Sequence, residues 1–241
     1  MQIQQQKALV TGANRGIGKA LVQSLVAAGV SKVYATGRNL NMLQSLVDLD
    51  PNRVIALELD VTKFEDIERA ADKAVDVTLL FNNAGVLDFG SVLEAPGDAF
   101  RRNLDVNFYG LLHVSRVFAL LLKQNGGGAI TNILTLVALA SMPGLGVYSA
   151  SKAAAWSATQ SLRIDLRKQG TKVFNVFPGA IDTDMLRSIE MPKTAPEHVA
   201  KEILAGIEAE MEDIFPDPMS QQLYRQWKAD HKAVEKQFAA M

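Results

Sequence analysis

Short apolar runs alternate with longer amphipathic stretches along most of the chain. The short runs are rich in β-branched and apolar residues and predict strands at residues 7–11, 32–36, 53–58, 77–81, 129–135 and 172–177. The stretches between them have helical periodicity and predict helices at residues 16–28, 40–48, 64–75, 100–124 and 147–169. Because each helix is long enough to carry the chain back across a sheet, this alternation is typical of parallel strands covered on both faces.

The fold class follows from the character of the strands. Residues 78–81 are apolar on both faces, as expected for a strand buried between two helical layers. With right-handed crossovers, the chain is predicted to form an α/β fold, a doubly wound parallel sheet of the Rossmann type. No repeat or Pro/Gly-rich linker divides it, so we expect a single domain over residues 1–241. Residues 212–216 predict a short seventh strand, and residues 220–239 predict a charged C-terminal helix.

Composition narrows the classes of function. The chain has 241 residues, 48% of them hydrophobic, which suffices for a sizeable core. Its formal net charge of -1 gives no reason to expect nucleic acid as a partner, and the absence of cysteine excludes a thiol nucleophile and a Cys-ligated zinc site. The three histidines have no metal-ligand spacing. We therefore expect a small-molecule partner and no bound metal.

The N-terminus and the most apolar segment bear on location. The first residues lack the apolar stretch of a signal peptide. The most apolar segment, residues 111–122, is interrupted by polar side chains and is shorter than the roughly 20 residues of a membrane span. The sequence therefore predicts a cytoplasmic protein without a membrane partner.

A glycine-rich turn follows the first predicted strand and leads into a helix. Glycines allow a tight turn and let backbone N–H groups approach a pyrophosphate, whose charge is stabilised by the helix N-terminus. Such glycines also occur in plain turns, but this position between strand and helix favours a dinucleotide site. The candidate phosphate-binding residues are Gly12, Asn14, Arg15, Gly16, Ile17 and Gly18.

Further motifs follow in a fixed order along the chain. They are Asp60-Val61, Asn82-Asn83-Ala84-Gly85, Asn107, Tyr148-x-x-x-Lys152 and Pro178-Gly179. Together with the Gly-x-x-x-Gly-x-Gly turn, this set spans residues 7 to about 212 and resembles the short-chain dehydrogenase/reductase family, in particular its carbonyl reductases that prefer NADP(H). The resemblance implies an oxidoreductase that transfers a hydride between NADP(H) and a carbonyl or a secondary alcohol.

The resemblance also implies which residues contact the cofactor beyond the glycine turn. They are Asp60, Val61, Asn83, Ala84, Gly85, Pro178, Gly179, Ile181 and Thr183. Asp60 and Val61 are expected at the adenine end, residues 83–85 at the ribose, and Ile181 and Thr183 at the nicotinamide. Two positions have a structural alternative: Asp60 would cap the helix that starts near Lys63, and Asn82 would tie neighbouring strands together.

The end of the second predicted strand indicates which nicotinamide cofactor is used. Sites that prefer NAD carry an acidic residue there, which binds the ribose 2′-hydroxyl. Here the sequence has Arg38, whose guanidinium suits bidentate phosphate binding, and Arg15 adds a second positive charge. The sequence therefore predicts NADP(H). The alternative is that both side chains are solvated loop arginines.

Tyr148 and Lys152 are the candidate catalytic pair. They are four residues apart at the start of a predicted helix, so their side chains share one face. A free tyrosine has a pKa near 10, and an adjacent ammonium is expected to lower that pKa toward neutrality. In the resembling family the lysine also holds the nicotinamide ribose, while the tyrosine hydroxyl gives its proton to the carbonyl oxygen.

The third expected member of the site departs from the family pattern. The family has a serine thirteen residues before the tyrosine, whereas this chain has Thr135. Threonine keeps the hydroxyl donor but restricts its side-chain torsion, so Thr135 is expected to hydrogen-bond the substrate oxygen. The alternative is a structural role for Thr135 at the strand end, with Ser141 or no hydroxyl at the substrate.

Asn107 completes the candidate catalytic residues. By the resemblance, it would hold a water against Lys152 and connect a proton relay to solvent, the alternative being an asparagine tolerated in a helix for local hydrogen bonds. A catalytically silent NADP(H)-binding sensor or interaction protein is the alternative function, and only Thr135 argues for it. A pure binding protein has no need of Tyr148, Lys152 and Asn107 together.

The substrate segment and the assembly are less defined by the sequence. Between Thr183 and Pro196 the segment expected to close over the substrate is short and apolar, which favours weakly charged aldehydes, ketones or secondary alcohols. By the resemblance, we expect a homodimer built on the helices at residues 105–124 and 150–169. A tetramer is the further option, and the charged C-terminal helix argues against the usual family route to it.

Overall fold

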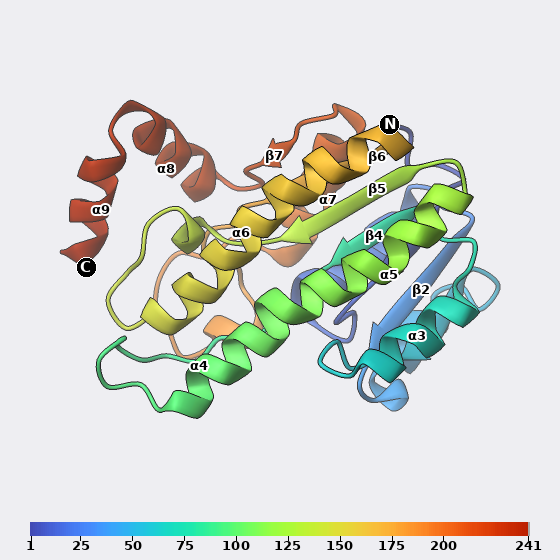
Figure 1. Cartoon of the computed structure of the whole chain (residues 1–241), viewed down its shortest axis with the longest axis horizontal. Coiled ribbons are helices and arrows are strands. Elements are labelled where there is room, and N and C mark those ends of the chain that lie inside the picture. Colours follow the sequence, from blue (N-terminus) through green and yellow to red (C-terminus); the bar gives the residue numbers. More distant parts are fainter. Residues whose placement is uncertain (241) are drawn as a thin grey trace.

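The computed structural model describes residues 1–240 as a seven-stranded parallel sheet between two layers of helices (Figure 1). The strands are β1 (Lys7–Val10), β2 (Lys32–Gly37), β3 (Val54–Glu58), β4 (Leu79–Asn82), β5 (Gly128–Ile133), β6 (Thr171–Val176) and β7 (Asp213–Ile214). Their spatial order is β3-β2-β1-β4-β5-β6-β7, and every neighbouring pair is parallel. The order reverses between β1 and β4, which makes the carboxyl ends of these strands the expected ligand crevice.

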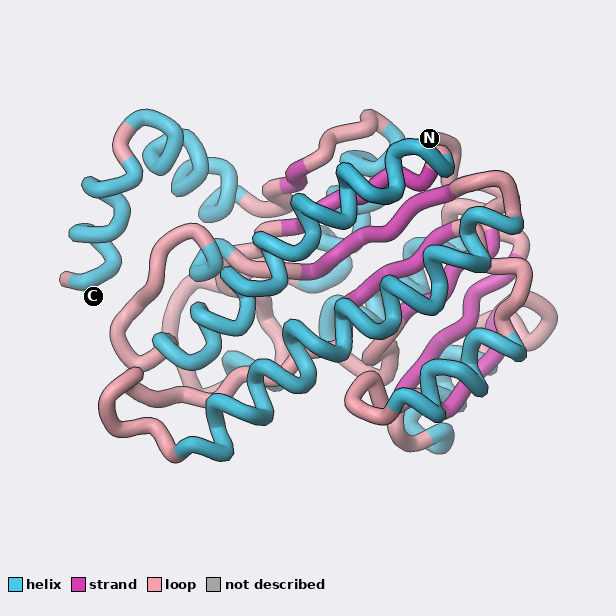
Figure 2. Tube along the Cα trace, viewed as in Figure 1, coloured by secondary structure: helices cyan, strands magenta, loops and turns pink. Residues whose placement is uncertain are grey.

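Two helical layers cover the sheet (Figure 2). The helices and short helical turns are α1 (Gly16–Ala27), η1 (Leu40–Leu43), α2 (Gln44–Val47), α3 (Phe64–Lys73), α4 (Gly97–Leu104), η2 (Asp105–Gly110), α5 (Leu111–Gln124), η3 (Leu136–Ala138), α6 (Gly146–Leu166), η4 (Arg167–Gln169), η5 (Asp184–Leu186), α7 (Pro196–Glu208), α8 (Pro218–Ala229) and α9 (His231–Ala239). One core cluster joins α1, α2 and α7 to the sheet, and a second joins α3, α5 and α6 to its other face. The predicted doubly wound fold is confirmed.

Most of the predicted helices and strands are present in the structure. Three differences affect the site or the C-terminal region. The segment 100–124 was expected as one regular helix, but it begins at Gly97 and contains a π-helical stretch, η2. The predicted C-terminal helix is two helices, because the Asp230 side chain accepts hydrogen bonds from the N–H groups of Lys232 and Ala233 and starts α9 anew. Between β6 and β7 the structure adds α7, which begins with Pro196 at its first position.

The long helical run of α4, η2 and α5 is the described segment with the length and composition of a membrane span. It covers 28 residues with a mean hydropathy of 1.2 in its most apolar window. Core helices of proteins that do not span a membrane share this length and composition. The run is longer than the segment 111–122 considered from the sequence. It lies along the sheet, and Asn103, Asn107 and Ser115 on it are buried.

A row of amide side chains crosses the sheet at one level. Asn82, Asn132, Asn175 and Asp213 are register partners on β4, β5, β6 and β7. Asn82 donates to Asn132 at 2.9 Å, Asn132 to Asn175 at 3.4 Å, and Asn175 to Asp213 at 3.3 Å. The row therefore pairs most of its polar groups, which would be costly if buried alone, and among the described residues only Asn82 Oδ1 in it stays buried without a partner. Asn82 has the structural role that was its alternative.

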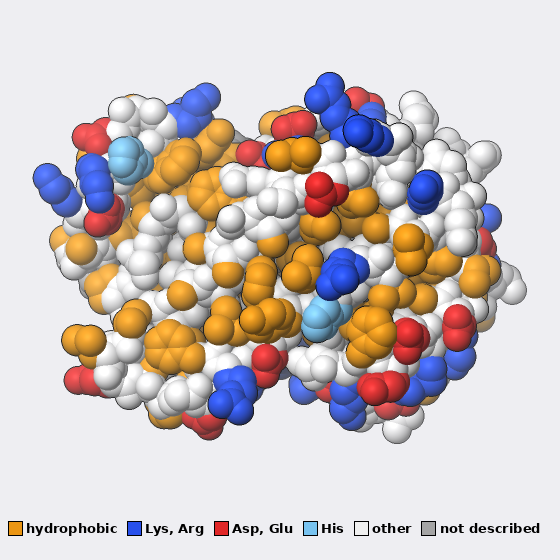
Figure 3. Space-filling model, viewed as in Figure 1, with side chains coloured by type: hydrophobic (Ala, Val, Ile, Leu, Met, Phe, Trp, Pro, Cys, Tyr) orange, Lys and Arg blue, Asp and Glu red, His pale blue; other side chains and the backbone are white. Residues whose placement is uncertain are grey.

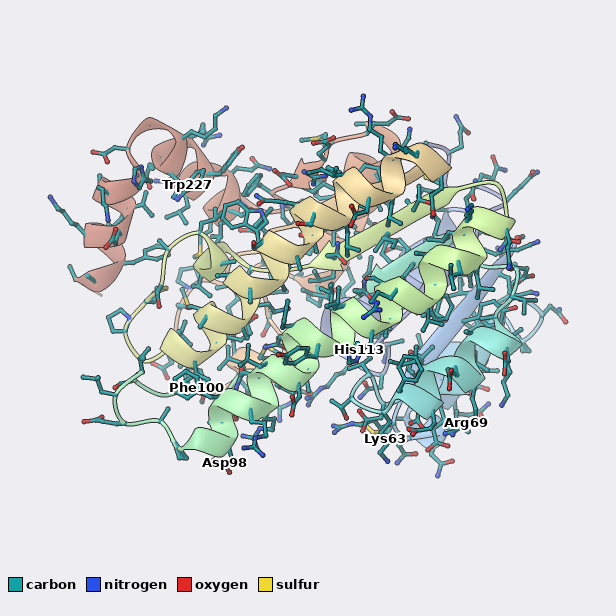
Figure 4. All side chains as sticks on the ribbon, viewed as in Figure 1. Lys63, Arg69, Asp98, Phe100, His113 and Trp227 are labelled. Carbon is teal, nitrogen blue, oxygen red and sulfur yellow. The ribbon has the colours of Figure 1, made fainter. Side chains whose placement is uncertain are left out.

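The C-terminal helices are tied to the body of the protein at two points. Asp217 is fully buried, caps α8 together with Ser220, and accepts a 2.9 Å hydrogen bond from Gly179 N–H in the turn after β6. Further along α8, Trp227 lies on the side that faces α6 (Figure 4), and its ring centroid is 6.1 Å from that of Trp156. The pair α8–α9 is therefore a packed part of the fold.

Candidate active site

A cavity of about 1240 Å³ opens at the carboxyl ends of the strands. One part, here called the polar half, is lined by the glycine turn, Arg38, Asp60 and residues 83–85. The other part, the apolar half, is lined by the segments around Met142 and Met185 and by α8–α9. Tyr148, Lys152 and Thr135 lie between the two. Ligand pockets commonly measure about 300–1,000 Å³, so this cavity has room for more than one small molecule.

The glycine turn presents a free helix N-terminus to the polar half. Gly12 and Gly16 have φ values of 64° and 54°, which only glycine adopts without strain. Arg15 is the N-cap of α1, but no side chain accepts a hydrogen bond from the first N–H groups, and the first turn has no acidic residue. These donors and the helix dipole suit an anion such as a pyrophosphate.

Asn83 and Gly18 hold the turn in place. The Asn83 side chain donates to Thr11 O and Gly12 O at 2.9 and 3.0 Å. A Cβ at Gly18 would lie 2.3 Å from Gly12 O, so glycine is required there for close packing. Gly18 is buried and does not line the cavity, whereas the other predicted residues of the turn do line it.

The charged residues of the polar half differ in the partners that their side chains have. Arg38 is exposed, and its side chain makes no ion pair within residues 1–240. Arg15 instead pairs with Asp184 of η5 at 3.5 Å, and both residues line the cavity. Asp60 lines the cavity and accepts hydrogen bonds from Thr62 at 3.0 and 2.8 Å. The N-cap of α3 is Lys63, without a side-chain cap, so the capping alternative for Asp60 is wrong.

Tyr148 and Lys152 lie one turn apart on α6, and both are buried. Lys152 Nζ is 6.0 Å from the centroid of the Tyr148 ring and donates a 2.7 Å hydrogen bond to Ile133 O, at the end of β5. Burial lowers the pKa of Lys152 to about 8, because its ammonium form loses hydration.

The pKa of Tyr148 moves against the expectation from the sequence. Burial raises the pKa of its hydroxyl above the ordinary value, and a hydrogen bond with Thr135 opposes this rise only in part. The lysine ammonium lies over the ring and bonds a carbonyl, so its predicted lowering of the tyrosine pKa is not observed.

Thr135 lies just beyond β5 and has two hydrogen-bond partners. Its hydroxyl bonds with Tyr148, and its Oγ1 accepts from Val137 N–H at 3.4 Å, which caps η3. Thr135 therefore combines a place in the candidate site with a structural role at the end of the strand. The alternative hydroxyl, Ser141, is exposed and does not line the cavity.

Asn107 is buried below the cavity, in the π-helical stretch η2. Its side chain accepts from Val86 N–H at 2.9 Å and donates to Val86 O and Ser151 Oγ, each at 2.9 Å. These bonds hold the segment that follows residues 83–85 against α6. A direct contact of the Asn107 side chain with Lys152 is not among the hydrogen bonds within residues 1–240, so the relay stays a prediction.

A family model described as short chain dehydrogenase matches residues 6–194. The chain belongs to the short-chain dehydrogenase family. A short chain dehydrogenase from Burkholderia cenocepacia J2315, solved in complex with NADP, has a TM-score of 0.93 and 38% identity to this chain, with 99% of each chain covered. Family membership supports an oxidoreductase and, in general terms, hydride transfer.

Two further proteins are also similar to the chain. A short chain dehydrogenase/reductase from Burkholderia phymatum in complex with NAD has a TM-score of 0.85 and 26% identity, with 98% of this chain and 96% of that one covered. The 1-deoxy-11-beta-hydroxypentalenate dehydrogenase of Streptomyces exfoliatus is 34% identical over 218 residues, which is 86% of this chain and 79% of its relative. Of the two similar Burkholderia structures, one therefore contains NADP and the other contains NAD.

Several residues of the apolar half were not identified from the sequence of this short-chain dehydrogenase. They are Met142, Met219, Gln222, Gln226, Gln237 and Phe238. The capping sequence Asp217-Pro218-x-Ser220 indicates that a helix starts at Pro218, but no sequence pattern says that this helix folds back onto the cavity. The segment between Thr183 and Pro196, which was expected to close over the substrate, does line the cavity through Met185, Leu186, Ile189 and Met191.

Proposed function

We propose that the protein is an NADP(H)-dependent oxidoreductase that interconverts a carbonyl and a secondary alcohol, with Tyr148 as the proton donor and acceptor. The observation that carries the proposal is the meeting of Tyr148, Lys152 and Thr135 in the same cavity as the glycine turn and Arg38. A binding protein would use the polar half alone, whereas proton transfer needs the three residues beside it.

The polar half fits a dinucleotide phosphate cofactor. The uncapped N-terminus of α1 offers N–H donors to the pyrophosphate, and Arg38 stands free at the position that meets the ribose 2′ group. No carboxylate occupies the end of β2, where a 2′-hydroxyl would be bound in an NAD-preferring site. The similar structure in complex with NADP agrees with this preference. The cofactor supplies the hydride, and the chain supplies binding, orientation and the proton.

The chain's own residues divide that work. Lys152 is tied to Ile133 O and presents its ammonium to the space beside Tyr148, where it would hold the nicotinamide ribose. The raised pKa of Tyr148 keeps the proton on its hydroxyl at neutral pH, which is the state required to protonate a carbonyl oxygen. Thr135, bonded to that hydroxyl, would donate to the same oxygen and stabilise the developing negative charge.

Two further properties, the assembly and the location, are also proposed. The outer face of α5 and α6 has exposed apolar side chains, among them Leu120 and Ile164, which are 64% and 74% exposed, and Figure 3 shows apolar side chains spread over this face around a histidine. Labelled His113 lies on α5 in the same view (Figure 4). A homodimer through these helices would cover them. A cytoplasmic location remains the proposal from the sequence.

Replacement Tyr148→Phe tests the proposal. The ring remains and only the proton donor is lost, so turnover of a carbonyl panel, followed by the loss of NADPH absorbance, should fall by about a hundredfold or more. NADPH affinity should stay within a few-fold of the parent. A variant that keeps more than about a tenth of the activity would remove Tyr148 from its role. If the parent binds NADPH but reduces no carbonyl in the panel, the silent sensor becomes the better description.

A further inference from the structure

Ser151 directly precedes Lys152 on α6 and is fully buried. Its hydroxyl has two hydrogen-bond partners: Oγ donates to Tyr148 O at 2.7 Å and accepts from Asn107 Nδ2 at 2.9 Å. A serine hydroxyl has a single hydrogen, and here that hydrogen is used on Tyr148 O. Toward Asn107 the hydroxyl therefore presents only a lone pair, so it pairs with the amide nitrogen and not with the amide oxygen.

The Asn107 amide has more acceptors around it than hydrogens to give. Its nitrogen donates to Val86 O and Ser151 Oγ, each at 2.9 Å, while Asn103 Oδ1 lies further away at 3.4 Å. Its oxygen accepts from Val86 N–H at 2.9 Å. Without the Ser151 hydroxyl, the second hydrogen would turn toward Asn103, and the amide would rotate away from Val86. Ser151 therefore fixes the direction of the Asn107 side chain.

The segment that Asn107 holds forms a wall of the cavity. Residues 83–86 follow β4 and line the cavity, in the part where the cofactor ribose is expected. A Cβ on Gly85 would lie 3.2 Å from Asn107 Oδ1 and 3.6 Å from Lys152 Nζ. The Asn107 amide is therefore directly behind this wall and close to the ammonium group of Lys152.

The same hydroxyl also bonds the first turn of α6. Tyr148 O accepts it, and the side chains of Tyr148 and Lys152 extend from this turn to the cavity. Because Ser151 and Asn107 are buried, water does not compete for their hydrogen bonds. Ser151 therefore joins two walls of the site, the segment after β4 and the start of the helix that carries the proposed proton donor.

Thr159 on the same helix has the same local bond without this connection. Its Oγ1 donates to Trp156 O at 2.8 Å, again three residues back, and Thr159 is also fully buried. Within residues 1–240 its side chain has no other hydrogen bond, and Thr159 does not line the cavity. Bonds of this kind are a local feature of helices. Ser151 differs from Thr159 by its bond from Asn107.

We infer that Ser151 is a positioning residue that acts through Asn107. Its hydroxyl holds residues 83–86 at a fixed place relative to Tyr148 and Lys152, so that the cofactor and the proton donor keep their distance. The inference rests on the proposed function, since it needs a cofactor along this segment and proton transfer at Tyr148. It assigns a role to one of the three positions that the pattern Tyr148-x-x-x-Lys152 leaves open.

Ser151→Ala removes the hydroxyl and keeps the helix, since alanine is the best helix former. NADPH affinity, measured by fluorescence titration, should fall by about three- to tenfold, as expected for the loss of one hydrogen bond. With saturating NADPH, kcat for a carbonyl that the parent reduces should fall by about tenfold, because a small misplacement of the reacting groups slows the transfer. The KM for that carbonyl should stay within about twofold, because the side chains around Met142 and Met185 are not part of the network.

Thr159→Val is the matched control, because it also removes one buried hydroxyl bonded three residues back on α6 and keeps the shape of the side chain. Denaturant unfolding measures the structural cost of each variant. Thr159→Val should leave NADPH affinity, kcat and KM within about twofold of the parent. If the two variants change affinity and kcat alike, Ser151 has only a structural role and the inference is overturned.

Asn107→Ala shows whether Ser151 acts through Asn107. In that background the hydroxyl has no amide to hold, so adding Ser151→Ala should change NADPH affinity by less than about twofold. A further loss of about three- to tenfold would mean that Ser151 acts by another route, which also overturns the inference. If the parent binds NADPH but reduces no carbonyl, the proposed reaction fails, and the NADPH affinities of these variants still decide the role of Ser151.

Discussion

The polar and apolar halves of the cavity are built from different kinds of residue. The polar half consists mostly of backbone and small side chains in the turns that directly follow β1, β2, β3 and β4. The apolar half consists of large side chains from loops and from α8–α9, which lie far from those turns in the sequence. A pyrophosphate is the same in every dinucleotide, so its site can be a fixed local turn, whereas a variable substrate is met by side chains from distant segments.

Thr135, at the junction of the two halves, should give the largest effect. Thr135→Val removes the hydroxyl with little change of shape, and loss of one donor to a developing oxyanion costs about a hundred- to a thousandfold in rate. Thr135→Ser keeps the donor and should retain activity within about tenfold. Both are measured as kcat with NADPH affinity alongside. Parental turnover by the Val variant would leave Thr135 with its capping bond to Val137 alone.

Asp217 tests whether the apolar half depends on its anchor. Asp217→Ala removes the buried cap of α8 and leaves the partly buried Gly179 N–H unpaired, which should lower the free energy of unfolding by about 2–3 kcal/mol. The control Asp230→Ala removes the exposed cap of α9 and should lower it by about 1 kcal/mol or less. Denaturant unfolding measures both.

The kinetics of the Asp217 variant show whether Asp217 also positions α8 at the apolar half, beyond its effect on stability. The KM for the ketone should rise more than the KM for NADPH, because α8 lines the apolar half. Equal changes in both constants would mean that Asp217 supports the two halves alike, and the contrast between them would be weaker.

Arg38 tests the specificity of the polar half. A charge-assisted hydrogen bond contributes about 1.5–3 kcal/mol, so the parent should prefer NADPH over NADH by at least about tenfold. Arg38→Asp should erase or reverse this preference, as measured by kcat/KM for each cofactor. Arg101→Asp, an exposed arginine outside the cavity, is the control and should change neither value. Equal use of both cofactors by the parent would contradict the NADP(H) assignment.

Lys152 gives the smallest effect, a pH dependence. Its pKa of about 8 means that the ammonium is lost as the pH rises through 8, so NADPH affinity should decline above that value by a few-fold. Fluorescence titrations on either side of pH 8 measure this decline, and Lys152→Arg, which stays charged, should not show it. A flat profile in the parent would remove the ammonium from cofactor binding.

The same pKa shift affects stability with a defined sign. The pKa of Lys152 is lowered on folding from the ordinary 10.5, so the unfolded chain binds more protons between these two values. The contribution of this lysine to the free energy of unfolding therefore rises with pH between about 8 and 10.5. Its burial is unfavourable to the fold at neutral pH, which fits a residue retained for its place in the site.

The strand–helix alternation determined the fold class, since each strand and crossover helix is encoded by its own periodicity. Several site residues were likewise predictable, because the residues of the glycine turn are close together in the sequence, as are Tyr148 and Lys152. The sequence placed Thr135 at the strand end, but it did not identify the two hydrogen-bond partners of its side chain, Val137 on η3 and Tyr148 on α6. The pKa of Tyr148 was predicted with the wrong sign, because burial depends on everything packed around the ring.

The sequence by itself determined those features whose physics is local: the turn that requires positive φ at Gly12 and Gly16, the helix spacing of Tyr148 and Lys152, and the missing carboxylate beside Arg38. Only the tertiary structure decided that α8–α9 lines the apolar half and that burial, more than the ammonium of Lys152, sets the pKa of Tyr148. The physical reason is that hydrogen bonding within a turn extends over a few residues, whereas desolvation and cavity shape arise from segments that are distant in the chain and meet only on folding.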